Sequence, residues 1–174
     1  MALTHLNVLP IGETRDSNWS EGGRLVGTIA HGPDGKSYRL VSYAQAITSP
    51  TNLTVMYSAA TDVRTVTRVT GTTDRVAGVI PKKKNGNNHD DIASGDYGWL
   101  MISGRVEVVH GDDGNTITAG DYVSASADTD TGKVDQSAGS GATYDEGVTF
   151  AICLETSSTD GGTPMVELLG PLKG

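Results

Sequence analysis

Turn-forming residues interrupt this chain so often that long helices are excluded. Clusters of glycine, aspartate and asparagine recur about every ten residues, a spacing typical of proteins built from many short strands. No longer window carries the i, i+3, i+4, i+7 apolar pattern of an amphipathic helix. Serine, threonine and valine are frequent, and 23 glycines accompany a single phenylalanine. The sequence therefore predicts an all-β protein in which helix is a minor component.

Two parts of the chain repeat a similar order of features, about 70 residues apart. Residues 47–55 and 75–80 in the first part parallel residues 117–123 and 148–152 in the second, and each part ends in a further apolar strand. We expect a compact β-sandwich or barrel with pseudo-duplicated halves, and loops at residues 82–95 and 127–146.

The first hairpin is predicted around Pro33-Asp34-Gly35, with strands at residues 24–30 and 37–43. Gly35-Lys36-Ser37 also matches the end of a phosphate-binding loop. That loop needs an earlier glycine where this chain has Ala30, and a helix where this chain has an alternating strand pattern. A turn is therefore the better interpretation.

Residues 1–20 lack strand alternation and precede the predicted β domain of residues 21–174. They have too little apolar periodicity to fold alone, so we expect an extended N-terminal arm that becomes ordered against a partner. A disordered tail is the alternative. The candidate anchors of the arm are Leu3, Leu6, Val8, Leu9, Ile11, Arg15 and Trp19.

The net charge of −8 is unevenly distributed. Residues 1–84 hold ten lysines and arginines against six acids, whereas residues 85–174 hold three against fifteen. We expect the basic part, residues 1–84, to contact an acidic partner and the acidic part, residues 85–174, to repel other copies of itself. The alternative is that the uneven charge belongs to a solvated surface and has no partner. Lys82, Lys83 and Lys84 form a possible basic docking loop, but no stacking aromatics accompany them, so we expect no nucleic-acid partner.

No motif points to catalysis or to a cofactor. The acidic stretch at residues 128–133 lacks the glycine and glutamate positions of a calcium loop. The four histidines are scattered, and His89-Asp90-Asp91 is the one local cluster with metal-ligand chemistry. Residues 95–98, Gly-Asp-Tyr-Gly, match part of a trimeric nucleotide hydrolase motif, but residues 161–164 lack its aromatic and arginine. We expect no enzyme activity, cofactor or metal.

The N-terminus lacks the basic start and apolar run of a secretory signal, and no stretch approaches membrane-spanning length. We therefore expect synthesis in the cytoplasm and no membrane partner. Cys153, the single cysteine, lies in an apolar strand-like run and is expected to be buried.

Four segments, read in order, resemble a known family. They are Val76-Ala-Gly-Val79, residues 93–104 (Ala-Ser-Gly-Asp-Tyr-Gly-Trp-Leu-Met-Ile-Ser-Gly), Ile117-Thr-Ala-Gly-Asp-Tyr-Val123 and Phe150-Ala-Ile152. This order is similar to that in capsid decoration, or cement, proteins of tailed bacteriophages, over roughly residues 22–170. The motifs are short and rich in glycine. The acidic loop at 127–146 and the basic run at 82–84 depart from the pattern.

The resemblance implies a virion structural protein that binds the outer surface of the phage head, made in the host cytoplasm, with the major capsid protein as partner. It also implies that trimers are frequent. A β protein with few aromatic residues has a limited core, and association buries more apolar surface and covers exposed strand edges. Another virion part (head-completion, tail or fibre-base protein) and a non-viral β binding module are the alternatives. The predicted core includes Trp99, Ile102, Val123 and Ile152, with Trp99 packed against Leu100 or Ile102.

Overall fold

The computed structural model describes residues 14–15, 26–32, 35–59, 62–71, 74–83, 86–111, 115–126, 132–137 and 148–170. Within these ranges the chain forms strands and turns and no helix, which confirms the all-β prediction. The strands are β1 Thr14–Arg15, β2 Ile29–His31, β3 Ser37–Tyr43, β4 Thr54–Ala59, β5 Asp62–Arg68, β6 Val76–Val79, β7 Tyr97–Glu107, β8 Tyr122–Ala125, β9 Val134–Gln136, β10 Ala151–Cys153 and β11 Met165–Leu168.

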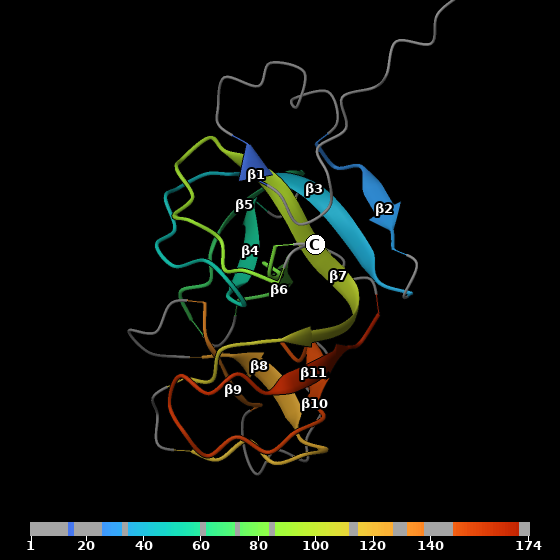
Figure 1. Cartoon of the computed structure of the whole chain (residues 1–174), viewed down its shortest axis with the longest axis vertical. Coiled ribbons are helices and arrows are strands. Elements are labelled where there is room, and N and C mark those ends of the chain that lie inside the picture. The colour runs from blue at the N-terminus through green and yellow to red at the C-terminus, as the bar shows by residue number, and fades with distance from the viewer. Residues whose placement is uncertain are drawn as a thin grey trace, which may run out of the picture.

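Five of these strands close into a barrel. Strand β3 pairs with β5, β5 with β4, β4 with β6, β6 with β7, and β7 returns to β3. The β3–β5 pair is parallel and the other four are antiparallel. Strand β2 forms the predicted hairpin with β3, but residues 26–28 of the predicted first strand are not in it, and the strand begins at Ile29. Strand β1 pairs with β7 at Tyr97 and Gly98. The barrel occupies the upper part of Figure 1.

A second sheet lies below the barrel in Figure 1 and contains β8, β9, β10 and β11. Strand β7 joins the two parts, because its first half pairs with β3 and its last four residues pair with β11. The change of partner falls at Gly104, where φ is 99°. Glycine adopts this backbone conformation without the steric cost of a Cβ, so the strand can turn from one sheet into the other. Strand β9 lies inside the predicted 127–146 loop, so that part of the loop prediction is wrong.

Two apolar cores follow from the alternation of side chains along the strands. The barrel interior is filled by residues from all five of its strands: Val41, Tyr43, Val55, Val66, Ala77, Leu100 and Ile102, with Ile47, Ile80 and Ile92 beside them. A second core joins the outside of β6 and β7 to the buried face of the second sheet, and contains Val79, Met101, Val106, Val123, Phe150, Cys153, Val166 and Leu168 among others. Cys153 is buried and free.

Trp99 is buried, but the expectation that it packs against Leu100 or Ile102 is wrong. Neighbouring side chains on a strand point to opposite faces. Leu100 and Ile102 point into the barrel, so Trp99 lies on the outside of β7. There it packs against Leu40, its direct cross-strand partner on β3.

The internal repeat takes a different form from the predicted one. Two turns of sequence Ile-x-x-Gly-Asp-Tyr, at residues 92–97 and 117–122, have the same hydrogen bonds and each leads into a strand. In each, the aspartate side chain accepts from a backbone N–H three residues earlier, Asp96 from Ala93 at 2.8 Å and Asp121 from Thr118 at 2.7 Å. The glycine before each aspartate has positive φ. Ile47, which the predicted repeat equated with Ile117, instead pairs with Ile92.

Tyr43 gives a test of the barrel interior. Its hydroxyl has no hydrogen-bond partner among the described residues, and burial, aided by the charge of Asp96, strongly raises its pKa. An unfolded tyrosine ionises near pH 10. The folded state therefore loses stability above about pH 10, by up to about 1.4 kcal/mol per pH unit. We expect Tyr43→Phe to remove this loss and to leave stability at pH 7 equal or higher, because an unsatisfied buried hydroxyl is destabilising.

Urea unfolding of both proteins at pH 7 and at alkaline pH measures this difference. If the stability of the phenylalanine variant falls in parallel with the wild type above pH 10, the burial of the Tyr43 hydroxyl is not the cause.

Candidate functional site

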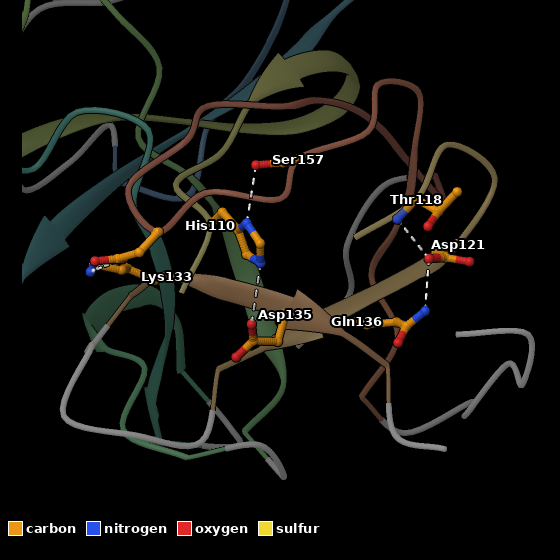
Figure 2. Close-up of polar contacts among 8 residues, drawn as sticks. His110, Thr118, Asp121, Lys133, Asp135, Gln136 and Ser157 are labelled. Atoms are coloured by element: carbon orange, nitrogen blue, oxygen red, sulfur yellow. Dashed lines mark hydrogen bonds and ion pairs between the residues drawn. The ribbon is translucent and has the colours of Figure 1, made fainter. Parts of the chain in front are cut away.

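A buried polar cluster lies where three distant segments meet (Figure 2). His110 follows β7, Asp135 lies on β9, and Ser157 lies beyond β10; all three side chains are buried. His110 Nδ1 is 3.0 Å from Ser157 Oγ, and His110 Nε2 is 3.8 Å from Asp135 Oδ1. No single sequence motif links these residues, since they are separated by more than twenty positions. Pattern reading missed the cluster for that reason.

The composition of the cluster matches a Ser-His-Asp triad, but its geometry does not. In a triad the carboxylate orients the histidine through a hydrogen bond, and the serine hydroxyl is open to the substrate. Here the gap between His110 and Asp135 is too long for a hydrogen bond. Ser157 is buried, and its hydroxyl lies close to the backbone of Gly162, where a side chain would leave no room for it. This arrangement does not present an activated nucleophile.

The cluster instead connects segments. The backbone N–H of His110 donates to the carbonyl of Gly162 at 2.8 Å, and that of Gly161 donates to the carbonyl of His110 at 3.1 Å. An ion pair between Lys133 and Asp160, 3.1 Å long, lies beside the cluster (Figure 2). These contacts hold β9 and the 157–162 turn against the end of β7. We interpret the cluster as a structural connection within the second sheet.

Ser157→Ala tests this interpretation. The substitution would leave His110 Nδ1 buried without its hydroxyl partner, so we expect a loss of about 1–3 kcal/mol in the free energy of unfolding. Ser158→Ala is the matched control, because Ser158 is exposed and should change stability by less than about 0.5 kcal/mol. Chemical unfolding measures both. Equal stability of the two variants would contradict a structural role for the cluster.

Two lysines of the predicted basic docking loop are engaged within the chain. Lys82 pairs with Glu107, which also accepts from the side chain of Asn52 at 3.1 Å. Lys83 pairs with Asp90 at 2.9 Å, and this pairing lowers the pKa of Asp90. Lys84 lies outside the described residues. The positive charge of this loop is therefore partly balanced by carboxylates of the same molecule.

Of the predicted arm anchors, Arg15 lies in β1, paired antiparallel with β7. The other anchors, Leu3, Leu6, Val8, Leu9, Ile11 and Trp19, lie outside the described residues. Among the predicted core positions, Trp99, Ile102 and Val123 are buried. The prediction for Ile152 is wrong: Ala151 and Cys153 face the core, so the alternation of side chains along β10 leaves Ile152 half-buried on the outward side.

Two surface features emerge only in three dimensions. Strand β2 stands at one end of the strand order and carries the exposed Ile29. The outward side of the second sheet carries the exposed Leu154 and Leu169. Within the described ranges, no group of three or more histidine, cysteine, aspartate or glutamate side chains is arranged to hold a metal ion. None of the described segments is a helix that is long and apolar enough to cross a membrane.

Comparison with known proteins finds similarity in structure but not in sequence. No protein-family model matches the chain, and no curated protein matches it in sequence. Among solved structures, it is similar to the N base of head fiber gp8.5 in bacteriophage phi29, with a TM-score of 0.48 and 15% sequence identity. The similarity covers 75% of this chain and 92% of that chain.

Proposed function

We propose that this chain is a structural protein of a tailed-bacteriophage virion. In this proposal it binds the outer surface of the head and reinforces contacts between major capsid protein subunits. The observation that carries the proposal is the position in the fold of the four segments that resemble capsid decoration proteins. They overlap β6 and β7 of the barrel and β8 and β10 of the second sheet, and β7 is the strand that joins the two parts. The resemblance therefore concerns the framework of the fold and is not confined to exposed loops.

The free edge of β2 supports a docking role. Among the described residues its outer edge has no strand partner, and Ile29 is 44% exposed there. An exposed strand edge can accept an added strand from a partner, with main-chain hydrogen bonds supplying affinity and side-chain contacts supplying register. We propose that this edge and the N-terminal arm together engage the capsid subunits.

We further propose that the chain acts without catalysis and as a homo-oligomer, with a trimer as the expected form. The polar geometry described above favours a role without catalysis. His110 and Ser157 connect segments of the second sheet, while Asp96 and Asp121 hold turns. High copy number on a capsid lattice would strengthen individually weak contacts through avidity.

Sedimentation with purified particle parts tests the proposal. The protein is mixed separately with phage heads that lack it, with tails, and with an unrelated protein shell. We expect it to pellet with the heads alone, and Ile29→Asp to weaken that binding. Pelleting with tails would instead identify a tail component. Failure to pellet with any phage part would reject the virion assignment and favour a non-viral binding module.

A further inference from the structure

Three polar side chains from distant positions meet at one carboxylate oxygen. Asn52 precedes β4, Lys82 follows β6, and Glu107 is the last residue of β7. Glu107 Oε2 lies 2.5 Å from Lys82 Nζ and accepts a hydrogen bond from Asn52 Nδ2 at 3.1 Å. An amine and a carboxamide therefore contact the same carboxylate. These are the groups needed for an amide exchange, in which an amine displaces ammonia from a carboxamide.

The backbone holds the carboxamide of Asn52 in place. Asn52 is 4% exposed, and its backbone has a φ of 64°, a conformation that asparagine adopts more readily than most residues. Its N–H donates to the carbonyl of Ile80 at 2.7 Å, and its carbonyl accepts from the N–H of Val109 at 3.2 Å. Ile80 lies two residues before Lys82, and Val109 lies two residues after Glu107. The same backbone contacts therefore bring all three side chains together, which is the positioning that a reaction between them requires.

The contacts assign a chemical role to each atom. A carboxylate only accepts hydrogen bonds, so Asn52 faces Glu107 through Nδ2, the atom that would leave. The amine of Lys82 is the nucleophile. The side chain of Lys82 is 42% exposed, so it keeps the rotational freedom to move from the carboxylate to the neighbouring carbonyl carbon. Because Glu107 Oε2 contacts both nitrogens, it can take a proton from the attacking amine and deliver it to the departing one.

We propose that Lys82 and Asn52 become joined by an intramolecular isopeptide bond, with Glu107 as the proton carrier. The bond between Lys82 Nζ and Asn52 Cγ forms, and the bond between Asn52 Cγ and Nδ2 breaks. Two of the three protons of Lys82 Nζ pass through Glu107 to the departing nitrogen, which leaves as ammonium. Glu107 returns to its carboxylate form. The reaction consumes no oxidant or cofactor, occurs once in each chain and turns over no substrate.

The cross-link would stabilise the barrel. It closes a covalent loop of residues 52–82, which contains β4, β5 and β6, three of the five barrel strands. A cross-link of this kind restricts the unfolded chain and so favours the folded state. The inference does not rest on the proposed virion function, because the bond can be detected in the purified protein.

Mass spectrometry of the full chain tests the proposal, after purification and again after incubation of the folded protein. We expect the wild type to weigh one ammonia molecule less than its sequence. Tryptic digestion should release residues 40–64 joined to residues 76–83, because trypsin does not cleave after an acylated Lys82. The full sequence mass after incubation would overturn the proposal. Loss of ammonia without this linked peptide pair would indicate cyclisation of an asparagine and would also overturn it.

Three variants locate the reacting groups. Lys82→Arg keeps the positive charge beside Glu107 but removes the nucleophilic amine, and Glu107→Gln removes the proton carrier at nearly constant size. Both should keep the full mass. Lys83→Arg is the matched control, because the adjacent Lys83 pairs with Asp90 instead, and it should lose ammonia as the wild type does. Lys82→Arg should also unfold at a lower temperature than Lys83→Arg.

Each variant can contradict the assignment. Linked peptides in Lys82→Arg, or their absence in Lys83→Arg, would overturn Lys82 as the nucleophile. Linked peptides formed by Glu107→Gln as fast as by the wild type would overturn Glu107 as the proton carrier.

Discussion

Replacing Trp99 with alanine is expected to lower the free energy of unfolding by about 3–5 kcal/mol, the usual cost of truncating a large buried aromatic side chain. Trp99 is almost fully buried and packs against Leu40 on the adjacent strand of the barrel. Both strands contribute to barrel closure, so the cavity would weaken the β3–β7 pairing on which the closure depends. Urea unfolding of the wild type and the variant measures the effect.

Trp19→Ala is a suitable control, because Trp19 is the other of the chain's two tryptophans and belongs to the predicted arm. It should leave the unfolding midpoint nearly unchanged, while Trp99 continues to report unfolding by fluorescence. A Trp99→Ala variant with wild-type stability but lost particle binding would contradict a packing role and would assign Trp99 to the docking surface.

Removing residues 1–13, the greater part of the N-terminal arm, is expected to reduce binding to phage heads at least about a hundredfold, because added-strand contacts depend on main-chain hydrogen bonds and on pockets for the apolar side chains. Deleting residues 1–13 leaves β1 and its pairing with β7 in place. The truncated protein should therefore fold with an unchanged unfolding midpoint. Sedimentation with heads at moderate salt measures the loss of binding.

A full-length variant with Leu6, Val8 and Leu9 replaced by serine separates the apolar anchors from the length of the arm. It should bind almost as weakly as the truncated protein. Undiminished head binding by the truncated protein would exclude residues 1–13 as the anchor and favour the β2 edge as the main contact.

Local features of this fold could be predicted from the sequence. Strand β3 spans Ser37–Tyr43 as expected, and the Gly120-Asp121 turn leads into β8 at Tyr122 as expected. Each depends on neighbouring residues: turn chemistry, glycine at positive φ, and a side chain that accepts from a nearby N–H. Such signals are contained within a few positions of the chain.

Long-range features could not be predicted in the same way. Barrel closure through β3 and β7 joins residues about sixty positions apart, and nothing in either strand specifies its partner. The position of Trp99 outside the barrel follows from that closure and not from the apolar run in which it lies. The His110 cluster likewise exists only once distant strands are paired. The docking predictions therefore needed the fold before their surfaces could be defined.

Electron cryomicroscopy of the particles with which this protein copurifies tests the virion assignment most directly. Heads assembled with and without the protein are compared as difference maps. The proposal predicts added density on the outer surface of the icosahedral shell, at joints between major capsid protein subunits, and this density should accommodate the barrel and second sheet. Density confined to the tail, or no ordered particle containing the protein, would contradict the proposal.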